Sequence, residues 1–177
     1  MKNPILVVSL ILLLCFVFGC QNKAEKAELE KFRAQAKVEE QNKVLSIRYL
    51  DAYQKGDIET LKEICSPDYV WHGRGQNLPL MDSIEALKQN MAVFSDIAYI
   101  SEDAIAKGDK VIVRYIVKGT HTGNIGDLPA TGKKVEISGI SIDRFENGKM
   151  VESWDASDNL GLFMQLGFEL KPKEVKK

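Results

Sequence analysis

Residues 129–155 read PATGKKVEISGISIDRFENGKMVESWD, and this stretch decides the fold. Asn147-Gly148 is the dipeptide preferred in two-residue β-hairpin turns, so it predicts a turn between two antiparallel strands. Met150 to Asp155 is then the return strand, and the residues before the turn form the strand that it pairs with. The stretch therefore predicts the last hairpin of an antiparallel sheet.

The strand before this turn changes its hydrophobic phase. Val135 and Ile137 are apolar at odd positions, whereas Ile140 and Ile142 are apolar at even positions. Successive side chains of a strand point to opposite faces, so one buried face cannot hold both pairs without an extra residue between them. The pattern predicts a β-bulge and a sharp bend at Ser138-Gly139.

Working outward, helical patterns come first and most strand patterns follow, which predicts an α+β fold with helices packed on a strongly curved, mostly antiparallel sheet. Such a sheet encloses a conical hollow. The expected helices cover residues 44–55, 58–65, 82–94 and 160–166, and the other expected strands cover 69–72, 97–106 and 111–117. The predicted buried faces are Val44, Ile47, Leu50 and Tyr53 in the first helix and Ile84, Leu87, Met91 and Phe94 in the third.

The N-terminus has the pattern of a lipoprotein signal peptide. Lys2 precedes the apolar run Ile5–Phe18, which is too short to span about 30 Å of hydrocarbon comfortably but suits a signal-peptide core. Gly19-Cys20 follows, and the stretch resembles a lipobox, in which the cysteine is lipidated and the chain is cut before it. We predict a lipoprotein anchored to the membrane through Cys20, in the bacterial cell envelope with its domain outside the cytoplasm. An uncleaved anchor and ordinary secretion are the alternatives.

Behind the signal peptide (residues 1–19), composition predicts three further segments. Residues 20–43 are rich in Lys, Glu, Ala and Gln and form a charged helical stalk or a disordered tether. Residues 44–168 are the folded domain, and residues 169–177 are a flexible Lys-rich tail. Lys plus Arg (24) nearly balance Asp plus Glu (25), which gives nucleic-acid binding no electrostatic support.

The polar residues in the strand regions are the candidates for chemistry. Asp155 stands at the end of the return strand, where apolar surroundings would raise its pKa and suit it to proton transfer; the alternative is a helix cap or a solvent-exposed side chain. His72 is the second catalytic candidate. The predicted pocket residues are Trp71, Arg114, His121, Ser153 and Trp154. The two histidines lack metal-ligand spacing, so no metal site is expected.

Several motifs together resemble one family. They are PDYVWHG (67–73), GTHTG (119–123), the 129–155 stretch and NLGLFMQLG (159–167). In this order they are similar to the SnoaL-like polyketide cyclase (ester cyclase) family, which has the nuclear-transport-factor-2-like fold. The resemblance covers about residues 44–167.

The resemblance implies an intramolecular aldol condensation without cofactor or metal, in which the aspartate matching Asp155 removes a proton next to a carbonyl. It also implies an apolar small-molecule ligand and, by analogy, a homodimer. The family commonly has His-Trp-Asp where this chain has Ser153-Trp154-Asp155. Serine cannot shuttle a proton near neutral pH as imidazole can. Two hypotheses follow: a cofactor-free cyclase or isomerase with Asp155 as base, and a non-catalytic domain that binds a small molecule or a partner.

Overall fold

The computed structural model describes the backbone of residues 4–169 and 171, and the side chains of residues 23–169 and 171. Its chain divides into two compact units, one ending at Val38 and the other starting at Glu39. Residues 1–3, the side chains of the rest of the predicted signal peptide and of Cys20, and most of the predicted tail lie outside the described part of the chain. Over the part of the chain that the structure describes, no helix has the length and apolar character needed to cross a membrane.

The first helix, α1 (Pro4–Lys55), runs through both units. Its side chains from residue 23 to residue 38 are all exposed. In the second unit the buried positions are Asn42, Ser46, Tyr49 and Ala52. The predicted face is wrong, because Val44 and Ile47 are 54% and 41% exposed. The helix packs through a more polar side than its hydrophobic pattern indicates.

Short elements follow α1 and lead into the sheet. Helix α2 (Ile58–Ile64) begins after Asp57, whose carboxylate accepts a hydrogen bond from the backbone N–H of Thr60 at 3.1 Å. Strands β1 (Cys65–Gly73) and β2 (Gln76–Pro79) form a hairpin, and α3 (Leu80–Val93) comes directly after it. Pro79 precedes the first turn of α3, so this helix begins two residues before the expected start at residue 82.

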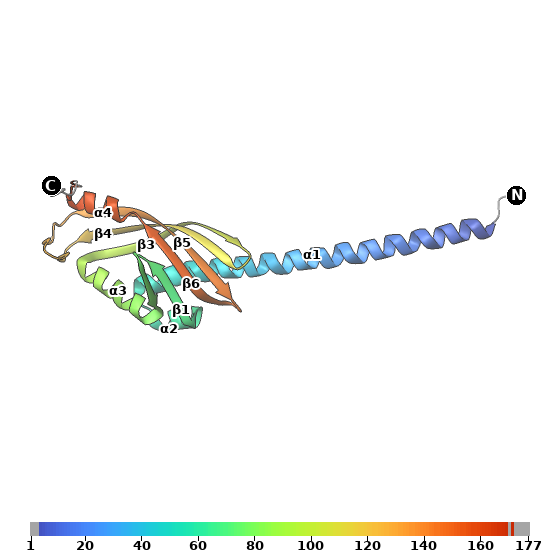
Figure 1. Ribbon diagram of the computed structural model, residues 1–177, viewed down its shortest axis with the longest axis horizontal. Helices are drawn as coiled ribbons and strands as arrows, with labels where there is room; N and C mark the ends of the chain where they lie inside the picture. Colours follow the sequence, from blue (N-terminus) through green and yellow to red (C-terminus); the bar gives the residue numbers. More distant parts are fainter. Residues whose placement is uncertain (1–3, 170, 172–177) are drawn as a thin grey trace, which may run out of the picture. The chain divides into compact units, whose positions relative to one another are not determined.

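Four long strands complete the sheet: β3 (Phe94–Lys107), β4 (Lys110–His121), β5 (Lys134–Glu146) and β6 (Lys149–Ser157). Helix α4 (Asn159–Leu166) follows β6, and Asp158 caps its first turn through the N–H of Gly161. The strand order is β2-β1-β6-β5-β4-β3, and every pair is antiparallel except β1 and β6. The predicted α+β fold, with helices on a mostly antiparallel twisted sheet, is confirmed (Figure 1).

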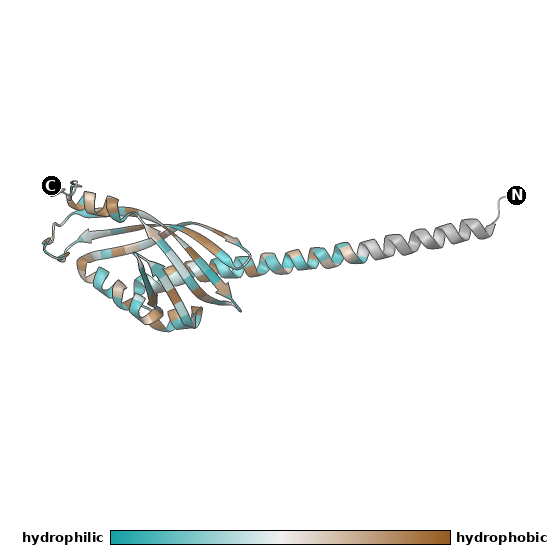
Figure 2. Ribbon diagram, viewed as in Figure 1, coloured by the Kyte–Doolittle hydropathy of each residue, from teal (hydrophilic) through white to brown (hydrophobic). Residues whose placement is uncertain are grey.

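The register of the sheet overturns the predicted bulge at Ser138-Gly139. Strand β5 pairs with β4 without interruption from Lys134 to Arg144, and the register shift of the last hairpin lies in β6, between Met150 and Glu152. All the even-numbered isoleucines of β5 therefore point to the outer face. Ile140 and Ile142 are 48% and 37% exposed, whereas Asp143 is buried. Along the strands hydrophobic and hydrophilic residues alternate, with hydrophobic ones on both faces (Figure 2).

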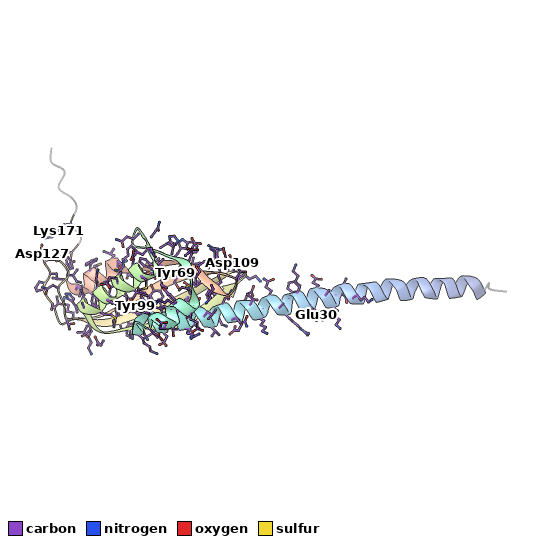
Figure 3. The ribbon with its side chains drawn as sticks, turned by 90° about the horizontal axis from the view of Figure 1, so that it is seen from below. Glu30, Tyr69, Tyr99, Asp109, Asp127 and Lys171 are labelled. Carbon is purple, nitrogen blue, oxygen red and sulfur yellow. The ribbon has the colours of Figure 1, made fainter. Side chains whose placement is uncertain are left out.

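The apolar core fills one end of the sheet's inner side. It joins α1 and α2 to β1, β4 and the β5–β6 hairpin through Tyr49, Leu61, Ile64, Tyr69, Val111, Val113, Phe145 and Met150. Asp109, in the turn between β3 and β4, lies at one end of the domain, and Asp127, in the loop between β4 and β5, lies at the other (Figure 3). Tyr69 and Tyr99 lie between them, in the interior that the sheet and helices enclose (Figure 3).

Candidate functional site

A cavity of about 670 Å³ occupies the inner side of the sheet beyond the core. Strands β1 to β6 supply one part of its wall, and Tyr53 of α1, the β1–β2 turn, helices α3 and α4 and the loop after β4 supply the rest. Its aromatic lining residues are Tyr53, Trp71, Phe94, Tyr99, Tyr115 and Phe163, and its charged ones are Arg74, Lys118 and Asp155. A volume in the range of small-molecule sites, an apolar wall and few polar groups are typical of a ligand pocket.

The parallel pairing of β1 with β6 assembles the charged part of this wall. It sets Gly73 beside Asp155, so the residue after Gly73 emerges next to the aspartate. That residue is Arg74, which together with Gly75 makes the two-residue turn of the β1–β2 hairpin. Both have positive φ, 50° and 74°, as a type I′ turn requires. A non-glycine residue in this conformation is uncommon and is worth a functional explanation.

Asp155 accepts a hydrogen bond from the phenolic hydroxyl of Tyr115, which lies on β4. Burial raises the pKa of Asp155, and the hydrogen bond from Tyr115 and the positive charge of Arg74 oppose this effect. A carboxylate with a raised pKa is a better base than an exposed one, because its protonated form is relatively more stable. The three side chains therefore combine a base, a neutral donor and a cation on one wall.

Two further tyrosines bring hydroxyl groups to the same region. Tyr53 donates a hydrogen bond to the backbone carbonyl of Ser83 at 2.9 Å, and its ring contacts that of Tyr99 edge-on, with centroids 6.0 Å apart. Burial raises the pKa of Tyr99 to about 12 and that of Tyr115 still further. All three phenols are thus neutral near pH 7. Tyr53 and Tyr115 give their single hydroxyl hydrogens to Ser83 and Asp155, which leaves Tyr99 able to donate a hydrogen bond to an oxygen in the cavity.

Two glycines leave room for aromatic side chains of the cavity wall. A Cβ atom on Gly139 would lie 2.3 Å from the ring carbon Cζ of Tyr115, and one on Gly73 would lie 2.3 Å from the indole of Trp71. Both distances are far below van der Waals contact. The glycines of β5 and β1 therefore leave the space that these rings occupy beside Asp155.

A second, smaller cavity of about 40 Å³ lies on the other side of Asp155, and we call it the chamber. Its polar lining residues are Ser46, Ser141, Asp143, Ser153 and Asp155, and its aromatic ones include Tyr49, Tyr53 and Tyr115. Asp143 is 2% exposed and accepts a hydrogen bond from the hydroxyl of Ser153 at 2.6 Å. Burial raises the pKa of Asp143 to about 6, even though the bond from Ser153 stabilises its charged form.

The predicted site residues separate into two groups. Asp155 and Trp71 line the large cavity, and Ser153 lines the chamber. The prediction that His72 acts together with Asp155 meets a structural obstacle, because His72 is on the outer face of β1. Its Nδ1 contacts Asn77 Oδ1 at 2.8 Å, its Nε2 contacts Glu152 Oε1 at 3.2 Å, and its ring stacks on that of Trp154.

The other three predicted pocket residues also line neither cavity. Trp154 is 37% exposed on the outer face, opposite Ser153 and Asp155. Arg114 is exposed and pairs with Glu102 across the β3–β4 ladder. His121, predicted at a rim, is fully buried against Phe94, and its Nδ1 accepts a hydrogen bond from the backbone N–H of Thr131 at 3.2 Å. Strand alternation explains Arg114 and Trp154, since each lies at an even position between inward-facing neighbours.

Sequence reasoning missed Arg74, Tyr115 and Asp143. Tyr115 is at an odd-numbered position of the strand, like the buried Val111 and Val113. This alternation predicts that Tyr115 lies on the inner face, but it does not indicate a contact with Asp155. Arg74 stands in an apparent loop between two glycines. Among the described residues, no group of three or more His, Cys, Asp or Glu side chains is placed to hold a metal ion.

The pKa of Asp143 leads to a prediction about stability. Between about pH 4 and pH 6 the folded chain retains a proton on Asp143 that the unfolded chain, with the usual value of 3.8, has released. This contribution to stability is complete below pH 4 and is lost as the pH rises through 6, by roughly 3 kcal/mol in total. Asp143→Asn cannot ionise. We expect the free energy of unfolding of the variant, relative to that of the wild type and measured in urea, to rise by about this much between pH 4 and pH 8. A difference between the two proteins that stays constant over this range would contradict the burial of a titrating carboxyl.

Comparison with known proteins agrees with this architecture. The chain is similar to two aklanonic acid methyl ester cyclases, DnrD of Streptomyces peucetius and DauD of Streptomyces sp. (strain C5). Each is 28% identical over 125 residues, which is 68% of this chain and 86% of DnrD or 78% of DauD.

Solved structures show the same fold. IdmH of Streptomyces antibioticus, provisionally named a polyketide cyclase, is 29% identical with a TM-score of 0.64, over 70% of this chain and 96% of IdmH. AclR of Streptomyces galilaeus, provisionally named a hydroxylase, is 26% identical with a TM-score of 0.65, over 78% of this chain and 87% of AclR. The family model for SnoaL-like polyketide cyclase matches residues 43–166, which include both cavities and most of the domain. The chain therefore belongs to the SnoaL-like polyketide cyclase family.

Proposed function

We propose that this protein is a cofactor-independent acid–base catalyst of the cyclase or isomerase type, which acts on an apolar, carbonyl-containing small molecule. One observation carries the proposal: a carboxylate with a raised pKa, Asp155, faces a large apolar cavity beside Arg74 and Tyr115. The family supports the cyclase class, since the relatives DnrD and DauD are named as cyclases of a polyketide-type methyl ester.

In this proposal Asp155 removes a proton from the carbon next to a substrate carbonyl. The electrons of the broken C–H bond move into an enolate, whose oxygen takes negative charge. Arg74 and the hydroxyl of Tyr99 stabilise that oxygen, because they supply a cation and a hydrogen-bond donor at the cavity wall. The enolate carbon then attacks a second carbonyl of the same molecule, and the proton held by Asp155 passes to the new alkoxide. The isomerase variant returns the proton to another carbon instead.

One observation favours the alternative, a non-catalytic domain that binds an apolar small molecule or a partner. Ser153 replaces the histidine that commonly precedes this aspartate by two residues in the family, and both histidines of this chain lie outside the cavity wall. A binding domain would keep the cavity without using Asp155 as a base. The two functions predict different effects of a substitution that removes the charge of Asp155 and keeps the shape of its side chain.

The proposed base is tested with a probe that does not depend on the natural substrate. 5-Nitrobenzisoxazole is flat and apolar, and its isoxazole ring opens at the N–O bond when a base removes the proton from C3. We expect the wild type to open it with saturation kinetics, and Asp155→Asn to lower kcat/KM by about 10²- to 10⁴-fold, the usual contribution of a general base.

Two matched variants serve as controls. Asp68→Asn makes the same chemical change at an exposed position of β1, and His72→Gln removes the other predicted catalytic side chain from the outer face. Both should retain wild-type turnover. If Asp155→Asn remains as active as these controls, the catalytic proposal is wrong. If the wild type binds the probe without opening it, the binding alternative is favoured.

We further propose that the protein is a lipoprotein, held in the bacterial cell envelope by acyl chains on Cys20. The support is the sequence alone: a positive residue, a short apolar run and Gly19-Cys20, followed by a polar segment. Several acyl chains hold a protein firmly, whereas one chain holds it marginally. The domain would then meet molecules that reach the envelope.

Cys20→Ser tests this anchor. We expect the variant to leave the membrane fraction and to lose incorporation of radiolabelled palmitate, because the serine hydroxyl cannot form the thioether. Cys65→Ser is the control, since Cys65 is a buried residue of the core. A Cys20→Ser protein that still labels and stays in the membrane fraction would refute the lipid anchor.

We also propose a homodimer that forms through the outer face of the sheet. Ile112, Ile140, Ile142 and Trp154 are each at least 37% exposed there, on three adjacent strands. We expect sedimentation to show a dimer for the wild type and a monomer for Ile142→Glu, because a charge would be buried at the contact. Met81→Glu, the same kind of change at a 50% exposed position of α3, away from the outer face, is the control; a wild-type monomer would exclude the dimer.

A further inference from the structure

The mechanism above leaves the buried carboxyl group of Asp143 without a role. We propose that Asp143 is a positioning residue for that reaction: its charge, acting across the chamber, sets the proton affinity of Asp155. The inference rests on the proposed function of Asp155 as the base. It adds a second acid that touches neither the large cavity nor a ligand within it.

The sheet register brings the two acids together. Asp155 of β6 is opposite Ser141 of β5, and Asp143 of β5 is opposite Ser153 of β6. Asp143 and Asp155 are therefore diagonal neighbours on the inner face, a relation that places backbone positions about 7–8 Å apart. Both carboxyl groups line the chamber, and Asp155 alone also lines the large cavity. Asp155 thus faces both spaces, together with Tyr53, Trp71, Tyr99 and Tyr115, which also line both.

The chamber is polar and has room for a water molecule. Its volume of about 40 Å³ exceeds the roughly 10–15 Å³ that one water needs, and serine hydroxyls and two carboxyl groups supply partners. Such a water would connect the two acids without opening the chamber to the ligand. Ser153 holds the carboxyl of Asp143 in place through its 2.6 Å hydrogen bond.

Asp143 lies among neutral and acidic side chains in the chamber. The titratable groups facing it are Tyr49 from α1, Cys65 and Tyr69 from β1, and Asp155 from β6. The described residues that line the chamber include no Lys, Arg or His. Arg74 lies on the cavity side of Asp155, so the base stands between a cation on one side and an ionisable acid on the other.

The consequence is a base whose strength depends on pH. Burial raises the pKa of Asp143 to about 6, so this group becomes charged as the pH rises towards neutrality. The charge of Asp155 contributes to this raised pKa, and because the repulsion is mutual, ionised Asp143 in turn raises the pKa of Asp155. Below pH 6 Asp143 is neutral, and the pKa of Asp155 is set by burial, which raises it, and by Tyr115 and Arg74, which oppose this rise. Ionised Asp143 therefore makes Asp155 a stronger base near neutral pH.

The test measures the titration of Asp155 directly in the full chain. In protein labelled with ¹³C at aspartate carboxyls, Asp155→Asn identifies the resonance of Asp155 by its loss. We expect the titration curve of Asp155 to have two linked inflections in the wild type and one in Asp143→Asn. The single pKa of the variant should lie about one to two units below the upper pKa of the wild type, as for two charges about 7 Å apart at an effective dielectric constant of about 20. Asp68→Asn should leave the curve unchanged.

A second variant keeps the proposal testable if Asp143→Asn does not fold. Ser153→Ala removes the hydrogen bond that stabilises charged Asp143, so the linked inflection of Asp155 should move to higher pH. A residue with a purely structural role would change stability without moving this inflection. The pH profile of 5-nitrobenzisoxazole opening should follow it, with a kcat at pH 8 several-fold lower in Asp143→Asn and an unchanged KM.

The two failures are distinguishable. An Asp155 titration that is identical in the wild type and in a folded Asp143→Asn or Ser153→Ala protein would overturn the coupling, whatever the activity. A wild type without turnover, but with the two linked inflections, would overturn the proposed reaction and leave the coupling standing.

Discussion

The parallel pairing of β1 with β6 is the constraint on which the rest of the site depends. It is the one parallel ladder among the sheet's pairs, and it joins the first strand of the domain to the last. Because it aligns Gly73 with Asp155, the β1–β2 turn delivers Arg74 to the end of β6. The same pairing turns Trp71 inward and His72 outward. A shift of the β1–β6 register by one residue would put His72 on the inner face and Trp71 on the outer face. It would also move Arg74 away from Asp155.

The domain reverses the usual burial pattern at the site. In β5 the isoleucines at 140 and 142 are exposed while Asp143 is buried, and in α1 Ile47 is exposed while Ser46 is buried. A buried carboxyl without a cation lowers stability, and exposed isoleucines gain nothing from burial within the monomer. Both features therefore need an explanation outside the stability of one chain: the proposed acid–base chemistry explains the inner face, and the proposed contact between copies explains the outer face.

The same reversal decides how much the sequence could predict. The Asn147-Gly148 hairpin, the Asp57 cap and the α+β order were predictable because each depends on local preferences. The expected bulge and the expected buried face of α1 were wrong because they assumed that every apolar side chain points inward. Asp155 could be predicted from its place at a strand end. Arg74 could not, since its position depends on a pairing between strands that are about eighty residues apart in sequence.

Ser153 gains a different meaning from this geometry. An imidazole there would provide a proton shuttle beside Asp155, and a serine provides none. The serine instead donates its hydrogen to Asp143 and leaves the chamber open between the two acids. Arg74 and Tyr115 by themselves favour the charged form of Asp155 and so weaken it as a base. In the proposed reaction, a second acid behind Asp155 opposes that effect, so that the same cation can stabilise the enolate without disabling the carboxylate that generates it.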